Sequence, residues 1–181
     1  MLPRIISSMG LVILIFSVVV VSGCTSNDPL DNVYKTESTG IKHFESEGIS
    51  FNASINWSFY KMENETADDY LFSISKGTDE NMDLIHFYAG NYNGTLSEYV
   101  SSEKKEIPLR NWTITSEKEL TVDGLPAYQI SALNQENKPL IKTWFMKNGT
   151  IHTIYAVPSA GKNLTNIETD LEIVISTFHA I

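Results

Sequence analysis

The chain has 181 residues, of which 42% are hydrophobic and 10% aromatic. This is enough for one domain with its own core, and it is too apolar for a globally disordered protein. The formal net charge is -9 at pH 7, and the densest basic cluster is only the pair Lys104-Lys105. An acidic surface repels phosphate backbones, so nucleic acid is excluded as a partner.

The first 23 residues have the pattern of an export signal. Arg4 supplies a positive start, and an apolar run extends from Leu11 to Val21 (LVILIFSVVVV) before the small residues Ser22-Gly23. The run is shorter than the roughly 20 residues that cross a bilayer as a helix, although a longer stretch that includes further serines approaches that length. We predict a signal peptide over residues 1–23, with an uncleaved N-terminal helix anchor as the alternative.

The only cysteine, Cys24, directly follows this segment. The stretch Val21-Ser22-Gly23-Cys24 resembles the lipobox of prokaryotic lipoproteins, in which cleavage before the cysteine leaves its thiol to carry lipid. The alternative is a buried free cysteine, which fits poorly because a polar stretch and no core sequence follows. We predict lipidation at Cys24, which leaves no thiol for disulfides, zinc sites or nucleophilic catalysis.

Residues 24–40 are polar and interrupted by Pro29, so we expect a flexible tether.

Seven asparagines begin an N-x-S/T triplet without proline: Asn52, Asn56, Asn64, Asn93, Asn111, Asn148 and Asn163. This pattern is typical of an exported glycoprotein, but a surface rich in Asn, Ser and Thr also generates such triplets without any glycan. We select five as candidate N-glycosylation sites: Asn64, Asn93, Asn111, Asn148 and Asn163. Asn148 lies in an Asn-Gly turn that must face solvent.

Apolar alternation predicts several strands in the first two thirds of the domain. The predicted strands are Ile49 to Ala53, Tyr70 to Ile74, Met82 to Ala89, Asn111 to Ser116, Leu120 to Val122 and Ala127 to Leu133. Between the third and fourth of these, Thr95-Leu96-Ser97-Glu98 forms a capping box, which predicts the start of a short helix.

A hairpin is predicted from Leu140 to Val157 around Asn148-Gly149, with Phe145 opposite His152 and Lys142 opposite Tyr155. Both faces of this hairpin are mainly apolar, so we expect helices on both sides of the sheet.

The last helix is predicted to begin with a second capping box, Thr165 to Glu168. Its apolar stripe consists of Ile167, Leu171, Val174, Ile175 and Phe178, with Glu168, Asp170 and Glu172 outside. Together, these strands and helices predict an α+β domain over residues 41–181, with an antiparallel β-sheet flanked by helices.

Three phrases, GISFNASINW, SEKELTVDGLPAYQISA and a closing STFHAI, resemble the PsbP-like and Mog1-like domains, particularly PsbP-related lipoproteins of methanogenic archaea. The resemblance covers most of residues 48–181, and its most telling piece is Val122 to Tyr128. It departs from the family pattern between Asn52 and Trp57, where related sequences often have a proline. The resemblance implies an α-β-α sandwich and a role in binding a larger protein, since family members include an extrinsic photosystem subunit and a regulator of a nuclear-transport GTPase.

The sequence contains no nucleophile elbow, P-loop, HExxH helix or dinucleotide fingerprint. Of four histidines, His152 is expected to pack in the sheet and His179 to lie in the last turn of the final helix, while His43 and His86 could meet only through the fold. Two acidic stretches, one from Glu63 to Asp69 and one from Asp79 to Asp83, lack the spacing of a calcium loop and are interpreted as solvated loops. Trp57, Trp112 and Trp144 fit either core positions or sugar-stacking platforms.

We therefore expect a non-catalytic, monomeric binding or accessory module that supports a cell-envelope complex, without cofactor or metal. It would be held at the outer face of the cytoplasmic membrane by lipid on Cys24. The alternative is a surface receptor for a small ligand or metal ion, with a cleft between sheet and helix that includes His43 or His86. A hydrolase is the third hypothesis and lacks a supporting motif.

Overall fold

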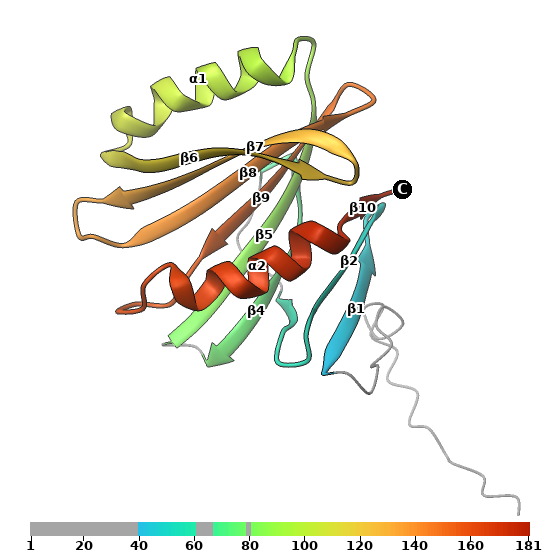
Figure 1. Ribbon diagram of the computed structural model, residues 1–181, viewed down its shortest axis with the longest axis vertical. Coiled ribbons are helices and arrows are strands. Elements are labelled where there is room, and N and C mark those ends of the chain that lie inside the picture. The colour runs from blue at the N-terminus through green and yellow to red at the C-terminus, as the bar shows by residue number, and fades with distance from the viewer. Residues whose placement is uncertain (1–39, 61–66, 79–80) are drawn as a thin grey trace, which may run out of the picture.

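The computed structural model describes residues 40–60, 67–78 and 81–181. The predicted signal peptide, nearly all of the tether, Cys24 and Asn64 lie outside the described residues, so these remain predictions. In the described part, two antiparallel sheets and two helices form the domain (Figure 1). None of the helices in the described ranges has the length and apolar character of a membrane span.

The larger sheet has seven strands in the order β3-β4-β5-β9-β8-β7-β6. Their bounds are β3 Ser58–Tyr60, β4 Tyr70–Thr78, β5 Asn81–Asn91, β6 Trp112–Val122, β7 Leu125–Asn134, β8 Pro139–Lys147 and β9 Thr150–Val157. The predicted β8–β9 hairpin is confirmed, with Phe145 opposite His152 and Lys142 opposite Tyr155. Its turn residues, Asn148 and Gly149, both have positive φ (52° and 79°), as a two-residue hairpin turn requires.

The smaller sheet has the order β1-β2-β10, formed by β1 Ile41–Ser46, β2 Ile49–Ser54 and β10 His179–Ala180. Because β10 pairs with β2, the end of the chain returns to the beginning of the domain. The ring of Phe51 in β2 stacks on Phe87 of the larger sheet at 4.6 Å between centroids. Full burial of such a side chain contributes about 1.5–3 kcal/mol, so these aromatic contacts attach the small sheet to the large one.

The two helices, α1 Leu96–Leu109 and α2 Thr165–Thr177, cover opposite faces of the seven-stranded sheet (Figure 1). Adjacent residues of β8 point to the two sides: Trp144 packs in the cluster that includes Val100 of α1, and Phe145 packs in the cluster that includes Leu171 of α2. The predicted α+β fold class, with helices on both sides of an antiparallel sheet, is confirmed.

Strand β6 is one continuous element, whereas the sequence predicted two separate pieces at Asn111 to Ser116 and Leu120 to Val122. The register shifts between Ile114 and Ser116, and the following residues are exposed. β6 is an edge strand, with a neighbouring strand on one side only, and it carries polar residues on both of its faces. The sequence therefore lacks the apolar–polar alternation by which a half-buried strand is predicted.

The second predicted capping box is wrong. The residue before α2 is Leu164, which has helical dihedrals (φ -57°, ψ -37°) and makes no side-chain cap, so Thr165 is already inside the helix. Leu164 packs against the core, and its helical backbone removes the extended N-cap position that a capping box requires.

Two predictions about polar residues near the C-terminus are also wrong. Asp170 was expected outside, but it is only 7% exposed and its Oδ2 lies 2.5 Å from Nζ of Lys76. His179 was expected in the last helical turn, but α2 ends at Thr177 and His179 belongs to β10. Both side chains are placed by contacts with strands that are distant in sequence, which helical spacing does not report.

Candidate functional site

Most of the predicted glycosylation asparagines lie at solvent-facing corners. Asn93 precedes α1, Asn111 follows it, Asn148 occupies the β8–β9 turn and Asn163 precedes α2, and all four are exposed. Two asparagines that begin such triplets were not among the selected five. Of these, Asn56 is exposed and Asn52 is half-buried. This exposure is compatible with modification, and glycan occupancy stays a prediction.

The four histidines do not form a site. His43 lies on the small sheet with Nδ1 2.9 Å from Oδ1 of Asn52, and His86 lies on the large sheet with Nδ1 2.6 Å from Oγ of Ser73. His152 stacks on Phe145 at 4.8 Å, as predicted, and its burial lowers the pKa of its imidazole. Across the described ranges, no three His, Cys, Asp or Glu side chains gather in a way that could hold a metal ion.

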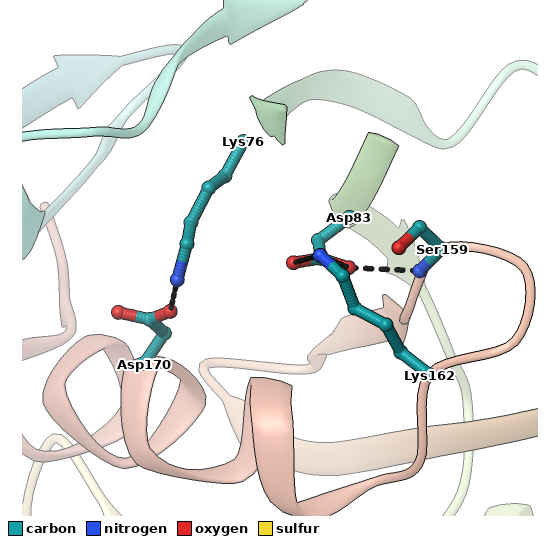
Figure 2. Close-up of polar contacts among 5 residues, drawn as sticks. All are labelled: Lys76, Asp83, Ser159, Lys162 and Asp170. Carbon is teal, nitrogen blue, oxygen red and sulfur yellow. Dashed lines mark hydrogen bonds and ion pairs between the residues drawn. The ribbon is translucent and has the colours of Figure 1, made fainter. Parts of the chain in front are cut away.

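A network of charged side chains fixes the segment around α2 to strands β4 and β5 (Figure 2). Asp83, whose side chain is 2% exposed, accepts a hydrogen bond from the backbone N–H of Ser159 at 2.8 Å and one from Nζ of Lys162 at 3.1 Å. Burial by itself raises the pKa of Asp83, but these hydrogen bonds and the charge of Lys162 outweigh it and hold that pKa below its usual value. Beside it, Lys76 pairs with Asp170. Because each carboxylate has its own lysine, the network is a structural connection and leaves no free charge for a ligand.

A hollow of about 910 Å³ borders this network at the loop between β9 and α2. Its walls are mainly apolar and include Met82, Leu84, Val157 and Leu164. Lys162, the charged residue that enters it from this loop, is already paired with Asp83. The other charged residues of its lining, Glu136 and Lys138, pair with each other at 2.7 Å, so the charges of the described residues at this hollow are satisfied within the protein.

A second cleft, of about 500 Å³, lies between α1 and the sheet, and five of its thirteen lining residues are aromatic. They come from four strands and the helix: Tyr88, Tyr99, Trp112, Trp144 and Tyr155. Trp144 is fully buried, which places it in the core, whereas Trp112 is only partly buried. The volume lies within the roughly 300–1,000 Å³ that is typical of small-molecule sites.

Four charged residues line the same cleft: Asp69, Glu103, Arg110 and Lys142. Nζ of Lys142 lies 3.2 Å from Oε2 of Glu103, and both side chains are about one fifth exposed (20% and 21%). The same ammonium group lies 5.9 Å from the ring centroid of Trp144 and 5.6 Å from that of Tyr155, within the range of cation–π attraction.

The end of α1 places Arg110 at the cleft. Arg110 is the C-cap residue, and its backbone N–H bonds to the carbonyl of Glu106, while Asn111 has a φ of 61°. Asparagine tolerates this left-handed conformation, so the chain turns from the helix directly into β6. A cation at a helix C-terminus is also favoured by the helix dipole.

Two phenols of the cleft, those of Tyr99 and Tyr155, stay protonated at neutral pH. Burial, assisted by the negative charge of Glu103, raises the pKa of Tyr99, and burial raises the pKa of Tyr155 against the opposing charge of Arg110. The described residues that line the cleft include no histidine, cysteine or serine. Its phenols and charged groups suit hydrogen bonding, and its rings suit aromatic packing.

Sequence reasoning missed this cleft, although parts of its signal were present. The hairpin register already placed Lys142 opposite Tyr155, and in the structure Tyr99 lies on the face of α1 that packs against the sheet. Glu103, one helical turn further, extends that face and could have been paired with Lys142. Arg110 and Asp69 carry no periodic signal, because both lie where elements end.

The comparisons with known proteins agree with this architecture. The family model described as PsbP-like protein matches residues 8–180. The chain belongs to the PsbP-like protein family. No curated protein matches the sequence.

Among solved structures, the cyanobacterial PsbP (CyanoP) of Synechocystis has a similar fold. It has a TM-score of 0.59 and 11% sequence identity, and the match covers 81% of this chain and 98% of that one. A Pseudomonas aeruginosa protein of unknown function, described as a putative regulator, has a TM-score of 0.49 at 8% identity, with 65% and 92% covered. At these identities the likeness establishes the fold alone, and only the first of the two supports that conclusion.

Proposed function

We propose that this protein is a lipid-anchored, extracytoplasmic accessory module that binds and supports a larger complex of the cell envelope, without catalysing a reaction. The observation that carries the accessory role is membership of the PsbP-like family, whose members are generally accessory and non-enzymatic. The anchoring rests on Cys24, which follows an apolar export segment directly.

The position of the chain ends in the domain is consistent with a tethered module. Strand β1 begins at Ile41, and the predicted tether of residues 24–40 would join it to the lipid. About 17 flexible residues have a root-mean-square length of roughly 20–25 Å, which lifts a folded domain clear of the lipid headgroups.

The anchor is tested by the intact mass of the protein purified from membranes of cells that export it. We expect a chain that begins at Cys24 with the added mass of lipid, and a Cys24→Ser variant that lacks this mass and leaves the membrane fraction. A chain that retains residues 1–23 in the membrane would instead establish the uncleaved helix anchor.

The accessory role is tested by crosslinking and mass spectrometry on native envelopes. We expect one dominant protein partner, which is lost in the Cys24→Ser variant because that variant is no longer held at the membrane. The absence of any reproducible partner in the anchored protein would contradict the proposal.

A surface receptor for a small ligand is the second candidate function. The observation in its favour is the cleft between α1 and the sheet, where aromatic and charged side chains converge. This cleft is formed without His43 and His86, which the sequence had suggested for it.

A further inference from the structure

Two charged side chains in the cleft under α1 form no ion pair with any residue that the structure describes. Arg110 enters from the end of the helix and Asp69 from the segment before β4, and both are exposed. Within the described ranges, neither the guanidinium nor the carboxylate makes a side-chain hydrogen bond or ion pair. The other two charges, Lys142 and Glu103, neutralise each other at 3.2 Å. The cleft therefore offers a ligand one cation and one anion.

We propose that this cleft binds a small zwitterion, with the ligand's carboxylate on Arg110 and its ammonium group on Asp69. A purely anionic ligand would gain Arg110 but would also face the two carboxylates, and a purely cationic ligand would face Arg110 and Lys142. A ligand with one charge of each sign pairs with both free groups and leaves no unpaired charge in the cleft. The planar guanidinium of arginine is well suited to a carboxylate, because it donates two parallel hydrogen bonds.

The aromatic walls suit the rest of such a molecule. Tyr99, Tyr155 and Trp112 supply ring faces and edges for the apolar part of a ligand. Ring faces also attract ammonium groups, and the protein's own Lys142 ammonium already lies near the rings of Trp144 and Tyr155. The volume of about 500 Å³ accommodates a free amino acid or a short peptide.

This inference names the ligand class for the second candidate function, and it does not depend on lipid anchoring. A binding measurement on purified full-length protein therefore separates the two questions. If no zwitterion binds, the proposed accessory role is unaffected. If no envelope partner is found, the proposed binding of a zwitterion in the cleft is unaffected.

The experiment uses the full chain in a non-ionic detergent and a panel of the free amino acids and glycine-containing dipeptides, screened by saturation-transfer NMR. We expect at least one zwitterion to bind. Its amide and its N-acetyl form, which each lack one charge, should bind about tenfold more weakly or worse by calorimetry, because each loses a charge-assisted contact. If no member of the panel binds, or if the capped forms bind equally well, the proposal is overturned.

Matched variants then locate the site. Arg110→Gln and Asp69→Asn should each weaken the affinity by about tenfold or more. Lys105→Gln and Asp68→Asn make the same charge changes at exposed neighbouring residues that do not line the cleft, and should leave the affinity within twofold. Equal weakening in the control variants would overturn the assignment, since it would indicate a general effect of net charge. Because all four side chains are exposed, we expect unchanged circular dichroism spectra.

Discussion

Nδ1 of His179 lies 2.8 Å from Oδ1 of Asp123, and this contact joins the C-terminal strand to the turn between β6 and β7. The other oxygen of Asp123 accepts hydrogen bonds from Nζ of Lys147 at 2.9 Å and from the backbone N–H of Ala180 at 3.2 Å. Lys147 also donates to the carbonyl of Ala180. The turn residue Asp123 thus holds both β10 and the end of β8, and it belongs to the stretch Val122 to Tyr128 that carries the family resemblance.

Replacement of Asp123 by asparagine should destabilise the domain by about 1–3 kcal/mol, because Lys147 and Ala180 lose a charged acceptor in a largely buried position. Asparagine tolerates the φ of 52° at this turn, so the change tests the carboxylate and not the backbone. The measurement is the free energy of unfolding in urea. Glu119→Gln, an equal charge change on the exposed face of β6, should stay within about 0.5 kcal/mol. A loss no larger than that of the control would contradict this role of Asp123.

The pair Lys76–Asp170 should show strong coupling between its two members. Lys76→Met leaves the carboxylate of Asp170 with little exposure and no cation, so we expect a loss of about 1–3 kcal/mol. A second change, Asp170→Leu, removes that uncompensated charge and should recover much of the loss. A double-mutant cycle from urea unfolding measures the coupling. If the two effects simply add, the pair makes no net contribution.

The stability of the domain should fall in acid partly because of Asp83. Its pKa is lower in the folded protein than the ordinary value of 3.8, so the unfolded chain binds the proton more tightly. The stabilising contribution is therefore fully present above that ordinary value and is lost as the pH falls through the lower folded-state pKa. We expect Asp83→Asn to be least stable relative to the natural protein at pH 6, with a smaller difference at pH 3. A difference that does not change between these two pH values would exclude Asp83 as a source of the acid sensitivity.

The two threonines of the predicted capping boxes should behave differently. Thr95 has extended dihedrals, and its hydroxyl accepts a hydrogen bond from the backbone N–H of Glu98, so Thr95→Ala should cost about 1 kcal/mol. Thr165 lies inside α2 and makes no such cap, so Thr165→Ala should change the free energy of unfolding by less than about 0.5 kcal/mol. Equal costs at the two positions would contradict the assignment of the helix starts.

Local patterns predicted much of the fold. The hairpin around Asn148-Gly149 was predicted with its register, because an Asn-Gly turn fixes the pairing and alternation fixes the faces. The stripe of α2, including Leu171 and Val174, is buried as its helical spacing indicated. These are short-range constraints, so a single sequence is enough to read them.

The contacts of the candidate site, in contrast, could not be predicted from the sequence. Lys142 and Glu103 are 39 residues apart and come from a strand and a helix, and their pairing depends on how α1 lies across the sheet. Nothing in the sequence near Asp69 indicates that it shares a cleft with Arg110. Such contacts arise from packing between elements, and periodicity within an element carries no information about them.

By itself, the sequence determined the elements with strong periodicity, the antiparallel α+β class and the expectation of an exported chain with a lone cysteine next to its apolar segment. The tertiary structure decided which charges are buried and which remain free. It paired Asp170 with Lys76 and Asp123 with His179, and it left Arg110 exposed at the cleft under α1. The physical reason is that hydrogen-bond and turn preferences act over a few residues, whereas burial and ion pairing depend on distances through space, which exist only after the sheet and helices have packed.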